Sequence, residues 1–372
     1  MFVDPVNEGK PNMSDAPRVH VSAMEGKGAY NRNAAIPASG GAFAIPLLEK
    51  AAQQISLDSG DRPIVIADYE SSQGKNSLAP MRAAIAALRM RAGRQRPIFV
   101  CHTDLPANDF SEMFALLESD PESYLQGEPQ VFPYAIGRSF YRSLFPPGYV
   151  DLGWSSYAAV WLSQIPVQIP DHFFIPCSTG SVRAEFDRQA ARDWEAFLTL
   201  RAAELRAGGR LVVALPALDH DGAIGFASMM NHANAELFEL VAAGAITADE
   251  RGRMTIAACP RREQDLLAPF ASGGRFHGLA VEHSDTLSVP DPAWIEFQRD
   301  GDAAALASKR AGFFRAVFVP SLSQALAPTR DAGERQIFAD RLEEGVRRRI
   351  ATSPASLENM VGIIALHKQA TG

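Results

Sequence analysis

Short apolar runs alternate with longer segments of helical periodicity along most of the chain. The apolar runs have the length and composition of buried strands. The expected strand segments are 63–68, 97–104, 131–137, 149–156, 210–218, 361–368 and a short strand within 275–289. The first two of these runs end in Asp68 and Asp104, so each is expected to carry a carboxylate at its carboxyl end.

Segments with apolar residues at helical spacing lie between these runs. The expected helices span residues 43–55, 77–92, 111–117, 183–207, 223–243, 302–318 and 336–352. Gly208 and Gly209 follow the helix expected at 183–207 and are expected to form its C-cap. Strands and helices that alternate at this rhythm predict a doubly wound parallel sheet, which binds ligands beyond the carboxyl ends of its strands.

The order of the elements predicts a nucleotide-binding type of α/β core with a helical cap. Residues 1–16 mix Pro, Gly, Asn and acidic residues without periodicity, so we expect a flexible tail there. The core is expected at residues 17–218, 268–290 and 353–372, and the cap at residues 219–267 and 291–352.

Composition and charge exclude several classes of protein. The 372 residues are 47% hydrophobic, and 36 Lys and Arg against 43 Asp and Glu give a formal net charge of −7, which argues against a nucleic-acid binder. Three scattered cysteines form no disulfide framework. No apolar run reaches the roughly 18 residues of a membrane span, and the start of the chain has no signal-peptide pattern. We therefore expect a cytoplasmic protein with no membrane partner.

Two loops after the first two strands are candidate cofactor sites. The segment from Asp68 to Asn76 leads from a strand through small residues into a helix, where backbone N–H groups can approach a ligand. It lacks the G-x-G-x-x-G pattern of dinucleotide sites, so an ordinary strand–helix loop is the alternative. Asp104 is placed to accept hydrogen bonds from both hydroxyls of a ribose. Its alternative is a helix cap, a role that suits Asn108 or Asp109 better.

Two aromatic segments are candidate pocket walls. Ser139 and Phe140 follow the third strand, where a small polar residue and an aromatic ring suit an adenine, although Phe140 also fits a core position. The segment from Trp154 to Ser163 holds four hydroxyl side chains and two indoles, a density that suits a pocket for a flat ligand. Aromatic core packing is the alternative there.

Metal and nucleophile motifs are weak. The eight histidines form neither an H-E-x-x-H motif nor a Cys/His spacing, so no metal site is expected. The chain has no G-x-S-x-G elbow, which argues against an α/β-hydrolase.

Four segments, in the same order and spacing, resemble the SABATH methyltransferases over about residues 24–368. These segments are VCHTDLPANDFSEMF, GRSFYRSLFP, SSYAAVWLSQIP and the helix DRQAARDWEAFLTLRAAELRAGG. The family transfers the methyl group of S-adenosylmethionine to small-molecule acids such as salicylate, benzoate and indole acetate, or to xanthine nitrogens. The resemblance implies a Rossmann-like class I methyltransferase sheet with an α-helical cap. Dimers are common among similar proteins, so a homodimer is a further expectation.

The resemblance also implies roles for individual residues. The donor would be bound by Tyr30, Asn33, Asp68, Ser71, Asp104, Leu105, Ser139 and Phe140. The acceptor would lie against Tyr157, Val160, Trp161, Met229 and Met230. Of these, Tyr157 and Trp161 are expected to carry catalysis, with the Trp161 N–H contacting the acceptor carboxylate.

Two positions depart from the family pattern. Glu70 stands in the first cofactor loop where the family has a glycine. Pro37 stands where the family has a glutamine that grips the acceptor carboxylate together with the tryptophan. A proline side chain has no hydrogen-bond donor, so another group would have to supply it, or the acceptor is not a simple aryl acid.

These observations predict methyl esterification of small aromatic or apolar carboxylic acids. A carboxylate is already ionised at neutral pH, so in-line methyl transfer to it needs no general base. Methylation of a heterocyclic nitrogen or a phenol is one alternative, for which His232 is the first candidate base. A methyltransferase-like binding protein without turnover is the other, motivated by Glu70 and Pro37.

Overall fold

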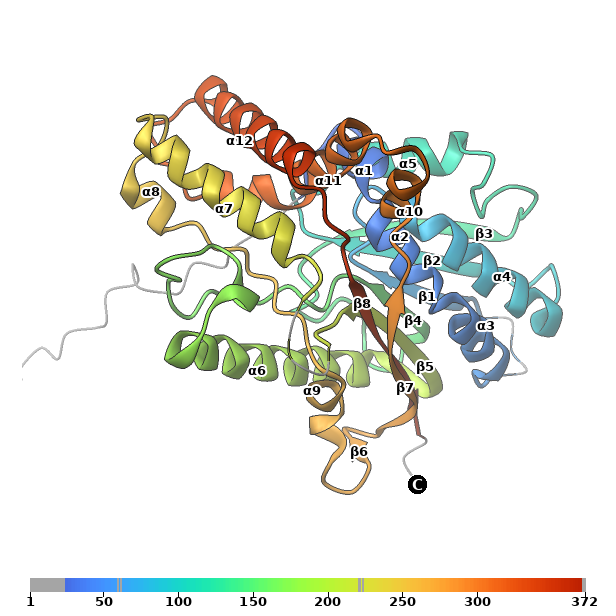
Figure 1. Cartoon of the computed structure of the whole chain (residues 1–372). Helices are drawn as coiled ribbons and strands as arrows, with labels where there is room; N and C mark the ends of the chain where they lie inside the picture. The colour runs from blue at the N-terminus through green and yellow to red at the C-terminus, as the bar shows by residue number, and fades with distance from the viewer. Residues whose placement is uncertain (1–23, 59, 61, 220–221, 223, 370–372) are drawn as a thin grey trace, which may run out of the picture.

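The computed structural model describes residues 24–369, apart from 59, 61, 220, 221 and 223. The tail expected at residues 1–16 lies outside the described residues. Within the described part, eight strands form one sheet in the order β3-β2-β1-β4-β5-β8-β7-β6 (Figure 1). The strands are β1 Ile64–Tyr69, β2 Ile98–Asp104, β3 Val131–Gly137, β4 Val150–Ser156, β5 Leu205–Pro216, β6 Arg275–Phe276, β7 Leu279–Val289 and β8 Asn359–Lys368.

The first five strands pair in parallel, as the alternation of strands and helices predicted. The last three add antiparallel pairs at one side of the sheet, β5 with β8, β8 with β7 and β7 with β6. The segment 275–289, expected to hold one short strand, therefore contains two. The parallel strands consequently share one carboxyl edge, where their loops meet.

Most of the expected helices form close to their expected bounds. The helices are α1 Ala29–Asn33, α2 Ala35–Ala42, α3 Ile45–Gln54, α4 Leu78–Ala92, α5 Phe110–Ser119, α6 Gly180–Glu204, α7 Ala227–Ala242, α8 Ala248–Gly252, α9 Glu263–Leu267, α10 Pro292–Asp300, α11 Ala303–Ser323 and α12 Ala332–Thr352, with 3-10 turns η1 Lys75–Ser77, η2 Ile175–Cys177 and η3 Ala268–Phe270. The short helices α1, α2 and α8 to α10 were not expected, because they are too brief to show a helical period.

The C-cap expected at Gly208 and Gly209 is wrong. Helix α6 ends at Glu204, and β5 begins at once with Leu205, which pairs with Val150. Gly208 lies inside β5 with a φ of 79°, and a Cβ there would come within 2.0 Å of the Ser56 hydroxyl oxygen. The two glycines thus serve a close approach within the strand rather than the end of the helix.

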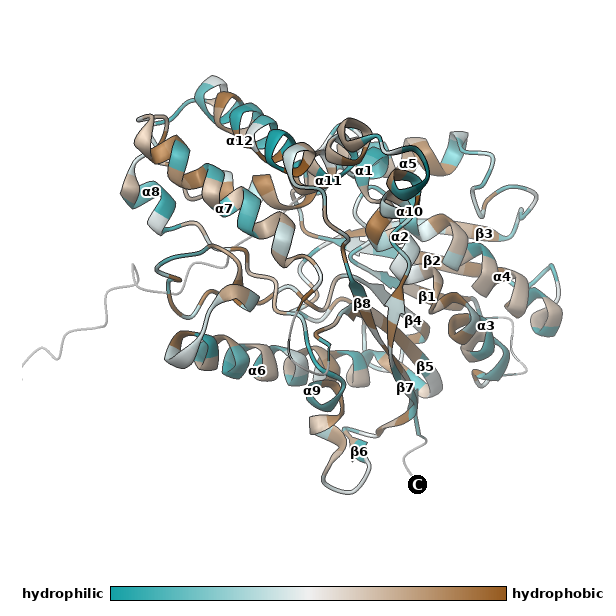
Figure 2. Ribbon diagram, in the orientation of Figure 1, coloured by the Kyte–Doolittle hydropathy of each residue, from teal (hydrophilic) through white to brown (hydrophobic). Residues whose placement is uncertain are grey.

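Apolar side chains cover both faces of the sheet. One face packs against α3, α4 and α5 and the other against α6, because neighbouring residues of each strand point to opposite sides. The central strands are accordingly hydrophobic, whereas the outer helices show mixed hydropathy (Figure 2). None of the described helices has both the length and the apolar character that crossing a membrane would demand.

Helices α7, α8, α11 and α12 gather beyond one end of the sheet (Figure 1). Helices α7, α11 and α12 share an apolar core with Tyr30 of α1 and with Val160 and Trp161, which follow β4. This core is separate from the two that cover the sheet faces. The division of the chain into a core and a helical cap stays a prediction.

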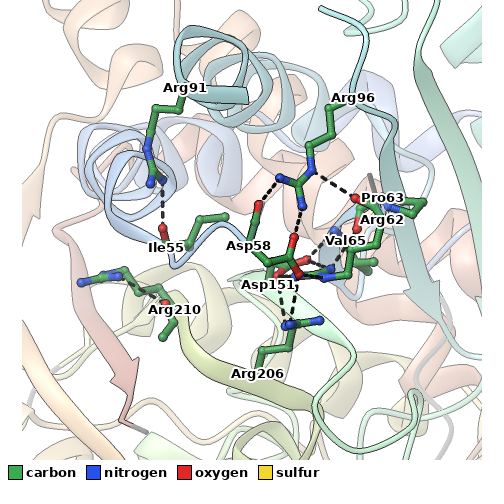
Figure 3. A network of polar contacts seen from close by, with 11 residues as sticks. Ile55, Asp58, Arg62, Pro63, Val65, Arg91, Arg96, Asp151, Arg206 and Arg210 are labelled. Carbon is green, nitrogen blue, oxygen red and sulfur yellow. Dashed lines mark hydrogen bonds and ion pairs between the residues drawn. The ribbon is translucent and has the colours of Figure 1, made fainter. Parts of the chain in front are cut away.

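An ion-pair network braces the opposite, amino end of the sheet (Figure 3). The buried carboxylate of Asp151 in β4 accepts hydrogen bonds from the guanidinium of Arg62 and, at 2.9 Å, from the Val65 N–H. Asp58 pairs with Arg62 and Arg96, and these hydrogen bonds lower the pKa of its carboxyl group. The network therefore fixes the start of β1. This end of the strand is remote from the loop that follows β1.

Candidate active site

The loops that follow β1 and β2 are joined through Asp104. Its Oδ2 accepts from the Ser72 N–H at 2.8 Å and its Oδ1 accepts from the Leu105 N–H at 2.7 Å. The side-chain amide of Asn108 donates to the Ser72 carbonyl at 2.8 Å. A carboxylate offers about four lone-pair sites, so Asp104 is held in place and can still accept two further hydrogen bonds.

The Asp104 carboxylate is buried and has no ion-pair partner among the described residues. Burial raises the pKa of Asp104 to about 6, against the opposing effect of the Leu105 and Ser72 amides, and the Asp68 charge raises it further. A buried acid without a cation is costly, because its charged form has lost its water. The site is therefore suited to a ligand that brings hydroxyl groups or positive charge.

Asp68 lies below the loop in a buried chain of hydrogen bonds. Its Oδ2 accepts from the Ser77 hydroxyl at 2.6 Å and lies 2.8 Å from Nδ1 of His102. Nε2 of that histidine lies 2.8 Å from the Tyr124 hydroxyl. Ser71 is held as well, since its N–H donates to the Thr103 carbonyl at 3.0 Å. Asp68 thus anchors the base of the loop, and its predicted contact with a cofactor stays a prediction.

The loop after β1 is strained and holds unsatisfied polar atoms. Glu70 and Ser72 have φ values of 64° and 50°, which non-glycine residues rarely adopt. The Ser72 hydroxyl, the Gln73 side-chain oxygen and the Thr103 hydroxyl are buried without a hydrogen-bond partner within the described chain. Strain and orphaned polar atoms of this kind cluster at ligand-binding sites.

The segment from residue 25 to residue 33 covers this loop. Asn31 donates to the Gln73 carbonyl at 3.0 Å and accepts from the Lys75 N–H at 3.2 Å. Tyr30 is buried beside it, and burial raises the pKa of its hydroxyl, with the Asp104 and Glu70 carboxylates adding to the increase. Asn33 instead donates to the Ala29 carbonyl, so Asn31 is the asparagine of this segment that contacts the loop.

A cavity lies beside Tyr30, between the carboxyl edge of the sheet and the cap helices. Its free space is about 530 Å³, open solvent at its mouth included. The lining residues are Met24, Tyr30, Pro37, Tyr157, Val160, Trp161, Phe174, Pro216, Ile224, Phe226, Ala258, Pro260, Phe313, Val317 and Phe318. Among the residues that the structure describes, this lining contains no charged side chain, and its polar side-chain groups are two phenol hydroxyls and one indole N–H. The cavity therefore fits an apolar molecule with a small polar end.

Tyr157 is held in the cavity wall by an unusual backbone. It has a φ of 59°, and its N–H donates to the Ala214 carbonyl at 2.8 Å. Its hydroxyl lies 3.2 Å from the amide nitrogen of Asn359. A Cβ on Gly40 would lie 2.0 Å from the same hydroxyl oxygen, so only glycine allows α2 to approach so closely.

Trp161 is fixed through its backbone, while its indole N–H has no hydrogen-bond partner among the described residues. The Tyr141 hydroxyl donates to the Trp161 carbonyl at 2.6 Å. The residue before it, Val160, accepts from the Cys259 N–H at 2.9 Å, and buried Arg261 donates to the Ala159 carbonyl. The indole ring is thus held against the cavity, and its N–H can donate to a bound molecule.

Other predicted residues lie outside the cavity lining. Phe140 is buried in the core and packs edge-on against Phe197, the alternative that its pattern left open. Met229 and Met230 are fully buried among the cap residues, and their contact with an acceptor stays a prediction. Leu105 and Ser139 are part-exposed at the ends of β2 and β3, beside Asp104 and Phe140.

Several lining residues were missed from the sequence. Ile224 and Phe226, just before α7, form one wall of the cavity. Phe313 and Phe318 of α11 supply another. Their aromatic density in the sequence was a usable signal, but an apolar helix gives no indication of which of its side chains face a cavity and which face the core.

Residues 17–369 match the model of a protein family described as SAM dependent carboxyl methyltransferase. The chain belongs to this family. The resemblance predicted from the four motifs is thereby confirmed, and so is the dependence of the family on S-adenosylmethionine.

Curated relatives and a solved structure agree with this assignment. Methyltransferase LUC1 of a Fusarium species is 28% identical over 260 residues, which is 68% of each chain. Methyltransferase FUS9 of Gibberella moniliformis is 30% identical over 54% of each chain, and a benzoic acid/salicylic acid carboxyl methyltransferase of Petunia hybrida is 28% identical over 53% of this chain and 58% of that one. The matches thus span from about half to about two thirds of these relatives.

The solved structure of a loganic acid methyltransferase with SAH shares the fold. It has a TM-score of 0.75 at 19% identity and covers 94% of this chain and 99% of its own. The expected Rossmann-like class I methyltransferase sheet is therefore confirmed.

The residues of the two loops fit S-adenosylmethionine. The acceptor sites left on Asp104 suit the two ribose hydroxyls, and the unpartnered Ser72 hydroxyl and Gln73 amide oxygen of the loop after β1, with the Thr103 hydroxyl of β2, can bind further polar groups of the ligand. The acidic character of the site suits a cationic cofactor.

Proposed function

We propose that this protein transfers a methyl group from S-adenosylmethionine to the carboxylate of a small aromatic or otherwise apolar acid. The observation that carries the proposal is the apolar cavity beside the Asp104 loops. Tyr30 connects the two, because it lines the cavity and interacts electrostatically with Asp104.

Asp104 would hold the ribose hydroxyls of the donor, with Leu105 beside the adenine. Tyr30 and Asn31 would cover the loop after β1, which limits the access of water to the donor. S-adenosylmethionine, when bound, supplies the electrophilic methyl group and takes up the electron pair of the broken S–C bond, so that the products are a methyl ester and S-adenosylhomocysteine.

The acceptor would lie in the apolar cavity with its carboxylate at the phenol and indole groups. The Trp161 N–H, which has no partner in the described chain, would donate to one carboxylate oxygen. Tyr157 and Val160 would orient the rest of the molecule. The contribution of the site is positioning, because an ionised carboxylate needs no base and in-line transfer depends on distance and angle.

The cavity lining favours a carboxylate over a nitrogen or phenol acceptor. Such acceptors gain from a general base, and among the described residues no histidine, aspartate or glutamate lines the cavity. His232, the first candidate base, is part-buried in α7, where burial lowers its pKa and Ser353 and Arg349 are its neighbours. It is therefore held at the end of α12 instead of in the cavity.

The test is a methyl-transfer assay with isotopically labelled S-adenosylmethionine. Benzoic, salicylic and longer apolar acids are compared with their amides and with phenols of the same shape. We expect label only with the acids, in a product that releases methanol on treatment with base. A base-stable product, or transfer to the amides or phenols alone, would overturn the carboxylate assignment.

A homodimer and a cytoplasmic location stay predictions. Sedimentation velocity of the purified chain tests the first, with a single species of twice the chain mass of 40.2 kDa as the expected result.

A further inference from the structure

Glu70 occupies an unfavourable backbone conformation in the loop after β1. Its φ of 64° lies in the region that glycine adopts freely and that costs other residues about 1–3 kcal/mol when the surrounding structure imposes it. It directly follows Tyr69, which is fully buried and donates a hydrogen bond to Glu204. The loop is therefore anchored on this side, and the Glu70 side chain is held where the strand ends.

The Glu70 carboxylate has no hydrogen bond or ion pair among the described residues. It is partly withdrawn from water, and the charge that acts on it is another carboxylate, that of Asp104. It also interacts with the hydroxyls of Tyr30 and Tyr141. Tyr30 lines the cavity and Tyr141 donates to the Trp161 carbonyl, so Glu70 interacts with a group of the cavity wall as well as with Asp104.

We propose that the Glu70 carboxylate is the counter-ion of the cationic, methionine-bearing half of S-adenosylmethionine. This inference rests on the proposed function. A withdrawn carboxylate next to a second carboxylate is stabilised by a cation, and the donor carries an ammonium and a sulfonium charge against one carboxylate. The Asp104 side chain serves the ribose, whereas Glu70, which interacts electrostatically with the Tyr141 hydroxyl beside the Trp161 carbonyl, serves the part of the donor that carries the methyl group.

Burial raises the pKa of Glu70 well above its ordinary value, and Asp104 raises it further. The groups that face it are Asp104, Tyr30 and Tyr141, and none of them is a cation. A bound cation stabilises the ionised form, so donor binding should release a proton from this carboxyl group. The heat of binding should then depend on the ionisation enthalpy of the buffer.

The experiment compares ligands that differ in charge, using isothermal titration of the full chain. S-adenosylmethionine carries the cationic end, whereas 5′-methylthioadenosine shares the adenosine and lacks it. In Glu70→Gln we expect roughly 10-fold or weaker binding of S-adenosylmethionine, unchanged binding of 5′-methylthioadenosine, and a smaller proton release. Glu118→Gln, an exposed glutamate on α5, is the matched control and should leave both affinities unchanged.

Equal affinity of S-adenosylmethionine for the wild type and Glu70→Gln would overturn the inference while leaving the proposed function intact. Equal weakening of both ligands would also overturn it, because the loop as a whole would then be disturbed. If Glu70→Gln does not fold, Glu70→Gly, which suits the positive φ, carries the same comparison. Failure of the wild type to bind S-adenosylmethionine at all would overturn both the inference and the proposed function.

Discussion

The N–H of Ser72 donates to Oδ2 of Asp104 at 2.8 Å, and this bond ties the loop after β1 to the end of β2. The two residues belong to neighbouring parallel strands, whose carboxyl ends meet at the same edge of the sheet. The Leu105 N–H donates to the other carboxylate oxygen, so the Asp104 side chain cannot rotate away without losing both hydrogen bonds. Asp104 is therefore presented as a rigid hydrogen-bond acceptor at the carboxyl edge of the sheet.

Replacement of Asp104 should weaken donor binding more than any other single change in the two loops. We expect Asp104→Ala to raise the Kd for S-adenosylhomocysteine roughly 10- to 100-fold, because two hydrogen bonds to a charged group are lost. Isothermal titration measures this. Asp109→Ala, which removes a helix cap nearby, is the control. A Kd that changes by less than about twofold in Asp104→Ala would remove this residue from the ribose site.

Donor binding should weaken as the pH falls through the pKa of Asp104, which burial raises to about 6. The ionised carboxylate, present above this pKa, accepts both hydroxyls, whereas the protonated form loses an acceptor and its charge. Glu70 also has a raised pKa, so its contribution must be removed. The pH dependence of the Kd for S-adenosylhomocysteine is therefore measured in Glu70→Gln, with and without Asp104→Asn. A pH dependence that persists unchanged after Asp104→Asn would contradict this account.

Replacement of Trp161 by Phe should affect the acceptor and spare the donor. The ring shape is largely kept while the N–H is removed, so we expect KM for the acid to rise roughly 10-fold, the cost of a hydrogen bond to a charged group. The Kd for S-adenosylhomocysteine should stay the same. Steady-state kinetics and titration separate the two effects, and an unaltered KM would show that another group holds the carboxylate.

The cap should lose stability in acid because of Glu250. Its buried carboxylate accepts from Arg330 Nε at 2.6 Å and Nη2 at 2.7 Å, and these bonds lower its pKa from 4.5 to about 2. A depressed pKa stabilises the fold above the unfolded value near 4.5, and the stabilisation is lost as the pH falls toward about 2.

Glu250→Gln should therefore reduce the free energy of unfolding by roughly 1–2 kcal/mol at neutral pH. This value is smaller than the pKa shift alone would give, because solvent screens the partly exposed Arg330. The difference from the wild type should shrink between about pH 5 and pH 2. Thermal unfolding across this range measures it, with Glu49→Gln, an exposed glutamate on α3, as the control. A difference that does not depend on pH would refute the ion pair as the cause.

The sequence predicted the parallel part of the sheet because each strand there is a continuous apolar run bounded by turn residues, such as Ile64–Tyr69. The prediction was wrong at Gly208. A glycine after a helical segment usually forms a C-cap, whereas this glycine allows a close contact with Ser56. That contact joins residues distant in the chain and leaves no local signal. Helices α1 and α2, which are too brief to show a helical period, contact the loop after β1 and Tyr157, and these distant contacts leave no local signal either.

The candidate site was predicted in part. Asp104, Tyr157, Val160 and Trp161 lie in the two loops or the cavity because motif residues at strand ends are fixed by the backbone that carries them. The cap side of the cavity could not be predicted, since an apolar residue such as Met229 and one such as Phe313 follow the same helical period. Which of them is buried and which lines the cavity depends on how α7 and α11 pack together.

Binding of S-adenosylmethionine to the purified wild-type chain tests the central claim most directly. We expect one saturable site per chain with a Kd in the micromolar range, displaced by S-adenosylhomocysteine and weakened roughly 10- to 100-fold in Asp104→Ala, as measured by isothermal titration. The absence of any heat of binding or displacement at about 1 mM ligand, a level corresponding to a binding free energy near −4 kcal/mol, would contradict the account.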